Sequence, residues 1–168
     1  IGYMPKSKLK RYNIKEVNYI NLFWILFPFS LFSLINVNSK IQRKFIYFIM
    51  PLLDFIVSLI VKKCDVFIGL SGVYNRSFKV VKKKYGSLTI CDRGSCHIKL
   101  QEEIIGSKME LNKRYINSEL EAYKNVDLIT VPSIFSFNSF INYGVSKDKV
   151  FVNNYGVDLN NFNITFNI

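Results

Sequence analysis

Short apolar runs alternate with amphipathic stretches along the chain from about residue 64 onward. The apolar runs, each rich in β-branched or aromatic side chains, occupy residues 66–71, 88–92, 128–133 and 150–152. Runs of this kind, almost free of charge, are typical of strands that are buried on both faces of a sheet. The intervening stretches repeat apolar residues at helical spacing, which predicts helices at residues 74–85, 108–125 and 135–143. We therefore expect an α/β fold, a Rossmann-like parallel sheet flanked by helices.

Two longer apolar segments, at residues 20–35 and 45–61, precede this alternating pattern. Each is shorter than the roughly 20 residues that a membrane-spanning helix requires, and Pro28 and Asp54 interrupt them. One interpretation is a pair of core helices in the α/β domain. A second is that the region 20–61 faces a membrane surface, because Lys/Arg clusters flank its apolar segments. A true span is disfavoured because a carboxylate is costly in lipid.

Positive charge is concentrated in the first part of the chain. Residues 1–99 carry 17 Lys and Arg against 4 Asp and Glu, whereas residues 100–168 carry 6 against 8. A basic part of this kind suggests an anionic partner, which could be membrane lipid, nucleic acid or a phosphorylated substrate. We expect no nucleic-acid partner, because the aromatic residues lie in apolar blocks rather than between Lys and Arg residues.

The length of 168 residues suits one domain or one and a half. The chain starts at Ile1 rather than Met and ends at Ile168 within an apolar stretch, so we expect a fragment of a longer protein. Its three cysteines, Cys64, Cys91 and Cys96, form no paired framework and lack the second Cys/His pair that would indicate zinc. So few cysteines fit a reducing cytosol, and a cytoplasmic location is therefore the expectation.

Polar or glycine-containing loops follow each of the four predicted strands. The loops contain Ser71 and Gly72, residues 92–97, Ser133, and residues 155–158. In an open parallel sheet, ligands bind beyond the carboxyl ends of the strands. The sequence thus predicts one binding edge formed by these four loops.

The densest of these loops is the segment 92–97, Asp-Arg-Gly-Ser-Cys-His. Arg93 could bind a phosphate or a carboxylate through its fork of donors. Gly94 would let a ligand approach the backbone closely. Ser95 could hydrogen-bond a ligand or cap a helix that begins near Ile98. These residue types together favour an anion-binding or hydroxyl-binding loop.

His97 ends this segment and is the one histidine of the chain. A neutral imidazole could contact a sugar hydroxyl or act as a base. The structural alternative is that His97 merely caps the following helix, while Arg93 pairs with Asp92 or Glu102. The sequence leaves both interpretations open.

Other polar positions carry weaker signals. Ser71 and Gly72 form a tight turn that could hold an anion on backbone N–H groups, although no glycine-rich fingerprint surrounds it. Ser133 suits an N-cap for the helix that follows. Glu119 and Glu121 lie two positions apart on a predicted helix, hence on different faces, so a paired-carboxylate mechanism is not expected. No P-loop, metalloprotease or nucleophile-elbow motif is present.

Several positions in the second half have the spacing of a known motif. They are Glu119, Asp127, Pro132, Ser133, Gly144, residues 155–158 and Phe162. This pattern resembles the stretch of family 4 glycosyltransferases that closes the N-terminal domain and enters the hinge between domains. Residues 64–72 and 92–97 also resemble a subgroup of these enzymes, so the resemblance covers residues 60–162.

The resemblance implies the N-terminal half of a GT-B fold, in which two Rossmann-like domains enclose the active site. On this basis residues 1–155 would form an incomplete acceptor-side domain without its first strand, and residues 156–168 the hinge and the start of a donor domain. The implied reaction is a retaining transfer of sugar from a nucleotide-sugar donor to an acceptor hydroxyl on a glycan or a lipid-linked molecule, without cofactor or metal. The protein would also bind peripherally to the anionic inner face of a membrane.

The resemblance also implies roles for individual residues. His97 would be the catalytic residue, in contact with the transferred sugar. The substrate-binding residues would be Ser71, Gly72, Arg93, Gly94 and Ser95, and the hinge residues would be Tyr155, Gly156 and Asp158. The glycine-rich loop and the whole C-terminal domain of the family are missing, so the fragment by itself is expected to be inactive. The alternative hypothesis is a non-catalytic α/β module that binds an anionic ligand or a membrane.

Overall fold

The computed structural model describes residues 39–105 and 113–156, with side chains from Tyr47 onward. The chain divides into two compact units, Ile1–Val57 and Ser58–Ile168. Helix α3 (Ser39–Ile60) confirms that the apolar segment 45–61 is helical and contains Pro51. Among the described residues, no helix is both long enough and apolar enough to cross a membrane. The apolar segment 20–35 lies outside the described residues.

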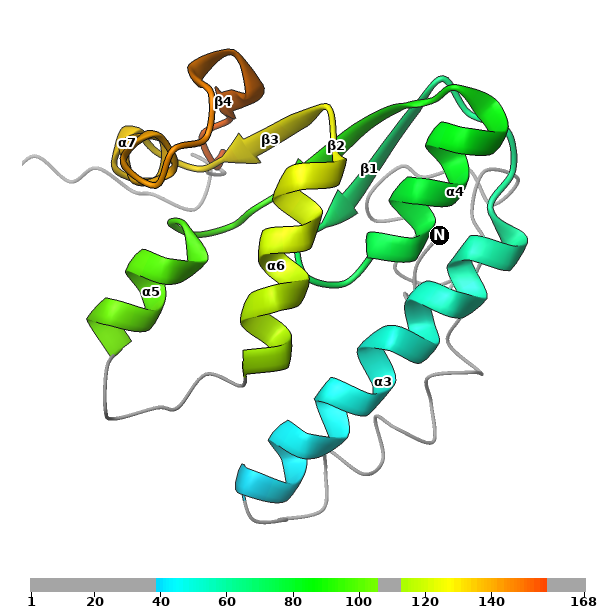
Figure 1. The fold of residues 1–168 in the computed structure, drawn as a ribbon, viewed down its shortest axis with the longest axis horizontal. Coiled ribbons are helices and arrows are strands. Elements are labelled where there is room, and N and C mark those ends of the chain that lie inside the picture. Colours follow the sequence, from blue (N-terminus) through cyan, green and yellow to red (C-terminus); the bar gives the residue numbers. More distant parts are fainter. Residues whose placement is uncertain (1–38, 106–112, 157–168) are drawn as a thin grey trace, which may run out of the picture. The chain divides into compact units, whose positions relative to one another are not determined.

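The second unit is an α/β domain built on a four-stranded parallel sheet (Figure 1). Its elements are β1 (Val66–Leu70), α4 (Asn75–Tyr85), β2 (Leu88–Asp92), α5 (Ile98–Ile105), α6 (Lys113–Asn125), β3 (Leu128–Val131), α7 (Ile134–Asn142), η3 (Lys147–Lys149) and β4 (Val150–Val152). This arrangement confirms the predicted parallel sheet flanked by helices, and it is consistent with a Rossmann-like fold. The first part of the helix predicted at residues 108–125, residues 108–112, lies outside the described residues.

The strands lie in the sheet in the order in which they occur in the chain. Right-handed connections between successive strands then all step in the same direction, so their helices cover the same face. In agreement, α4 contacts β1 and β2, α6 contacts α4 and α5, and α7 contacts β4 (Figure 1). One face of the sheet therefore builds the core with the helices.

We predicted that the strands are buried on both faces of the sheet. For the described residues this prediction is wrong. Successive strand residues point to opposite faces, and Gly69, Thr89, Cys91, Ile129 and Val131 are buried on the helical face. The opposite face carries exposed apolar side chains from three strands, namely Val66, Ile68, Leu70, Leu88 and Phe151. The physical reason is the strand order, because connections that all step one way leave the other face without a connecting helix.

Aromatic side chains anchor the helices to the sheet. Phe78 of α4 and Phe140 of α7 are almost completely buried, and burial of such a side chain stabilises a fold by roughly 1.5–3 kcal/mol. The ring of Phe78 meets Phe67 of β1 edge to face at 5.5 Å. Gly69 allows this close approach, because a Cβ there would lie 3.0 Å from Phe78 and from Tyr74. This packing fixes where the carboxyl end of β1 lies.

The predicted helices 74–85 and 135–143 agree with α4 and α7 to within one residue at each end. Ser133 is the N-cap of α7, with its hydroxyl accepting a hydrogen bond from the backbone N–H of Ser136 at 3.2 Å. Gly144 follows α7 with φ of 82°, and Gly86 follows α4 with φ of 68°. Both have the left-handed conformation that ends helices and that glycine adopts without strain. The connections of the sheet therefore start and stop where local chemistry dictates.

Candidate functional site

The loops after the strands are held side by side at the carboxyl edge of the sheet. The backbone N–H of Ser71 donates to Asp92 O at 3.1 Å, and that of Arg93 donates to Thr130 O at 2.8 Å. Asn153 N donates in the same way to Val131 O at 2.8 Å. The parallel ladder thus continues past the strand ends, so the described parts of the predicted loops share one edge.

Arg93 forms a buried ion pair with Glu119 of α6 at this edge. Its Nη1 lies 2.8 Å from Glu119 Oε1, and the side chains are 6% and 0% exposed. Arg93 Nε donates to Cys96 O at 3.1 Å, and Nη2 donates to Gln101. The interpretation that Arg93 pairs with Asp92 or Glu102 was therefore wrong, because the buried carboxylate of α6 takes that place.

Glu119 Oε1 is the centre of a wider polar network. It accepts hydrogen bonds from Ser71 Oγ at 3.2 Å and from Tyr115 Oη at 2.7 Å, in addition to Arg93. Glu119 Oε2 and Tyr123 Oη, one helical turn apart, are also buried but have no hydrogen-bond partner among the described residues. Burial, followed by the charge of Glu119, raises the pKa of Tyr123, so its hydroxyl stays neutral beside the carboxylate.

The charges of this network are strongly coupled. Burial alone would lower the pKa of Arg93, but Tyr123, Glu119 and Tyr115 outweigh it and the pKa is raised. Burial, followed by the charge and the hydrogen bond of Glu119, raises the pKa of Tyr115 to about 12. Arg93 is thus a permanent cation, and Tyr115 is a neutral donor at physiological pH. The guanidinium holds the loops together and points away from solvent.

Two glycines allow close approaches at the edge. Gly72 has φ of 70°, and a Cβ there would lie 2.8 Å from Glu119 Oε1. A Cβ on Gly94 would lie 2.6 Å from Tyr155 Oη. The structure thus brings Tyr155, a predicted hinge residue, against Gly94 of the predicted substrate loop. Asp158 lies outside the described residues, and Gly156 has open space around it.

His97 lies in an aromatic cluster and caps α5. Its ring stacks on Tyr143 at 4.6 Å and meets Phe140 and Tyr123 at 5.0 and 5.2 Å. Its Nδ1 accepts a hydrogen bond from Lys99 N at 3.3 Å, so the capping interpretation agrees with the structure. Ser95, the other predicted cap, instead has its hydroxyl 3.9 Å from Cys96 Sγ.

The His97 ring is uncharged at physiological pH. Burial, followed by the nearby charges of Lys99 and Arg93, lowers its pKa to about 4. A neutral ring whose Nδ1 accepts a hydrogen bond carries its proton on Nε2. The side chain is only 2% exposed. Two residues of the predicted substrate loop therefore have different neighbours. Arg93 contacts Ser71, and His97 packs against α7.

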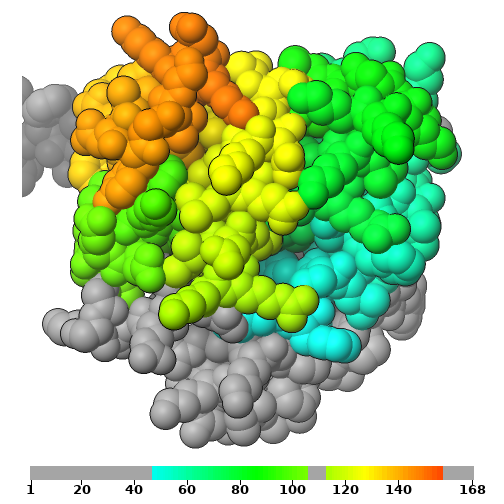
Figure 2. All heavy atoms as spheres, in the orientation of Figure 1, coloured from blue at the N-terminus to red at the C-terminus, as the bar shows by residue number. Residues whose placement is uncertain are grey.

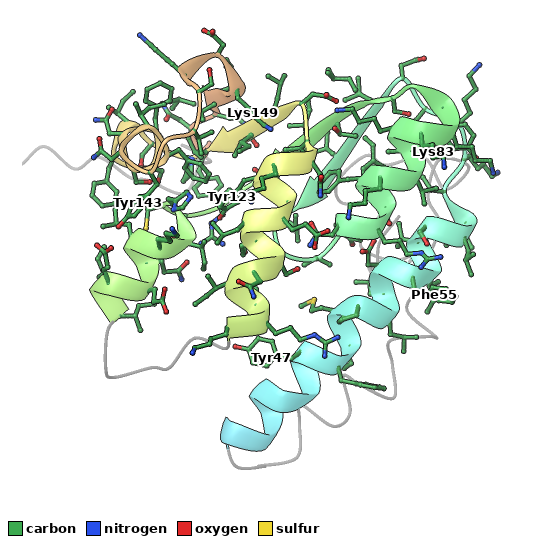
Figure 3. All side chains as sticks on the ribbon, in the orientation of Figure 1. Tyr47, Phe55, Lys83, Tyr123, Tyr143 and Lys149 are labelled. Atoms are coloured by element: carbon green, nitrogen blue, oxygen red, sulfur yellow. The ribbon has the colours of Figure 1, made fainter. Side chains whose placement is uncertain are left out.

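A pocket of about 430 Å³ lies on the helical side of the domain. His97 and Lys99 line it after β2, together with residues of α6, of the end of α7 and of the segment before β4. Figure 3 labels three of the lining residues, Tyr123, Tyr143 and Lys149. The sequence does not reveal this pocket, because its lysines are widely separated in the chain. Among the described residues, no group of three His, Cys, Asp or Glu side chains could hold a metal ion.

No family model, curated protein or solved structure matches the chain. The fold and the contacts at the sheet edge are therefore the observations from which a function can be argued.

Proposed function

We propose that this chain is the acceptor-side domain of a glycosyltransferase, which transfers sugar from a nucleotide-sugar donor to an acceptor hydroxyl. The support is the combination of the motif spacing over residues 60–162 with a parallel Rossmann-like sheet. Such sheets bind ligands at the carboxyl ends of their strands. Ser71, Arg93 and Gly94, from the loops that share the resemblance, lie at that edge.

The contact between Gly94 and Tyr155 is the observation that carries the proposal. In a two-domain transferase, the acceptor loop and the segment leading to the donor domain must meet at the interdomain cleft. Tyr155 is 72% exposed while its Oη lies over Gly94, so the last described segment leaves the sheet at the loop edge. A glycan or a lipid-linked acceptor on an anionic membrane would approach this edge.

The proposal gives the edge residues different tasks. Gly94 and Ser95 face the substrate, because they are the more exposed members of the loop. Arg93 and Ser71 position that loop through Glu119, since their donors are already engaged inside the protein. His97 is assigned a positioning role through its cap on α5, because its ring is enclosed by three aromatic rings. Direct contact of His97 with the transferred sugar stays a prediction.

The test is to recover the full reading frame and to assay sugar transfer from a panel of nucleotide sugars. We expect a second Rossmann-like domain downstream and transfer to a glycan or lipid-linked acceptor. In that enzyme, Gly94→Val places a side chain under Tyr155 and should raise KM for the acceptor. Lys83→Val, which introduces the same side chain at an exposed position of α4, is the control. A downstream frame without such a domain would contradict the proposal.

A further inference from the structure

Three lysines gather in the pocket on the helical side of the domain. Lys99 comes from α5, Lys124 from α6 and Lys149 from the segment before β4. Lys149 is half-buried, and its Nζ donates to Lys124 O at 3.2 Å, which directs it along the end of α6. Figure 3 shows Lys149 at the upper end of α6. The pocket therefore has a cationic end that is built by three separate elements.

None of the described residues that line the pocket is a carboxylate that could balance these charges. The nearby Asp127 forms an ion pair with Lys82, and Glu103 accepts a hydrogen bond from Tyr143. Burial, followed by repulsion from Lys82, lowers the pKa of Lys149, although Asp127 opposes this. Within the described residues, neither Lys99 nor Lys124 has an ion-pair partner. The positive charge is therefore available to an anion.

Apart from His97 and Ser146, the remaining side chains that line the pocket are apolar or aromatic. Leu120 and Tyr123 line it from α6, and Tyr143 and Val145 line it from the end of α7. The hydroxyl of Ser146 adds a small polar group at the rim and makes no side-chain cap of its own. A volume of about 430 Å³ is within the range of small-molecule sites. An inorganic ion would leave most of this space and its apolar walls unused.

We propose that this pocket binds a small organic phosphate. The phosphate lies among the three lysines, and the organic part packs on Tyr123 and Tyr143. The site adjoins the proposed acceptor edge, because His97 and Lys99 follow β2, whereas Lys124 and Lys149 precede β3 and β4 and lie near the amino ends of these strands. The inference holds whether or not the chain belongs to a glycosyltransferase.

Isothermal titration calorimetry of the 168-residue chain with phenyl phosphate tests the proposal, with inorganic phosphate and phenol as comparison ligands. We expect phenyl phosphate to bind more tightly than either comparison ligand, since only it engages both ends of the pocket. Lys124→Gln and Lys149→Gln should each weaken binding about tenfold, the effect of losing one charge-assisted hydrogen bond. Lys149→Arg should largely restore it.

Lys83→Gln is the matched control, because Lys83 is exposed on α4, outside the pocket (Figure 3). It removes the same charge and should leave the affinity unchanged. Equal weakening by Lys83→Gln would overturn the proposal in favour of general attraction to a basic protein. Equal affinity for inorganic phosphate, or absence of binding, would overturn it as well. Lys124 is exposed, so Lys124→Gln remains a valid test if Lys149→Gln fails to fold.

Discussion

Replacement of Glu119 by Gln would remove the charge that faces Arg93 while leaving the side-chain shape almost unchanged. Glu119 Oε1 accepts from Arg93, Ser71 and Tyr115, and a Gln oxygen in the same place could still accept all three hydrogen bonds. The Gln NH2 group would replace Glu119 Oε2, which accepts no hydrogen bond from the described residues. The substitution therefore isolates the loss of a buried negative charge beside a buried guanidinium.

The expected loss of stability follows from the burial of both groups. Their side chains are 6% and 0% exposed, so solvent screens the pair very little. Removal of one member of a buried ion pair costs about 3–5 kcal/mol. Since the hydrogen bonds persist in Glu119→Gln, we expect the lower end, about 3 kcal/mol. That is a large part of the 5–15 kcal/mol by which native domains are typically stable.

Urea unfolding followed by far-ultraviolet circular dichroism measures this loss. Glu121→Gln is the control on the same helix, because Glu121 forms an exposed ion pair with Lys79 and should cost less than about 1 kcal/mol. In a double-mutant cycle, Arg93→Met combined with Glu119→Gln should cost at least about 1 kcal/mol less than the sum of the two single changes. If Glu119→Gln is no more costly than Glu121→Gln, the buried pair does not have the strength argued here.

Three further predictions concern glycine packing and pH. Gly72→Ala should destabilise by about 1–3 kcal/mol more than Gly144→Ala, because both positions have positive φ but only the first places a Cβ against a buried carboxylate, and urea unfolding measures the difference. The pKa of His97 is about 4, below its usual 6.5, so stability should fall as the pH drops from about 6.5 to 4; titrated unfolding of His97→Gln should lack that slope. The pKa of Asp127 is lowered to about 2, because its hydrogen bonds to Lys82 and Thr89 outweigh burial. Its contribution is therefore present above about 3.8 and is lost towards pH 2, and Asp127→Asn should lose that acid dependence in unfolding measured between pH 5 and 2.

The sequence was informative wherever one local pattern decides the structure. The apolar run 88–92 became β2 without a change of boundary, and Ser133 caps α7 as its position before the helix predicted. The edge shared by the strand-end loops followed from the parallel sheet alone. These features depend on periodicity, on capping chemistry and on the geometry of βαβ units, all of which can be predicted from nearby residues.

The contacts between distant elements could not be predicted in the same way. Arg93 had nearby acids in the sequence, but its partner is Glu119, 26 positions away on another helix. The usable signal was the position of Glu119 on the same helical face as Ile116 and Tyr123, because a carboxylate on a buried face needs a cation. The lysine pocket gave no comparable signal, since its residues meet only after three helices have packed.

The order of the strands has a consequence for how the domain is made. From β2 onward, each strand pairs with the strand synthesised before it, so the sheet can grow as the chain leaves the ribosome. Arg93 is an exception to this sequence of events. It emerges with the loop after β2, but the carboxylate that neutralises it arrives later, with α6. We therefore expect nascent chains that end before Glu119 to be susceptible to proteolysis at the loop after β2, and chains that extend beyond β3 to be protected there.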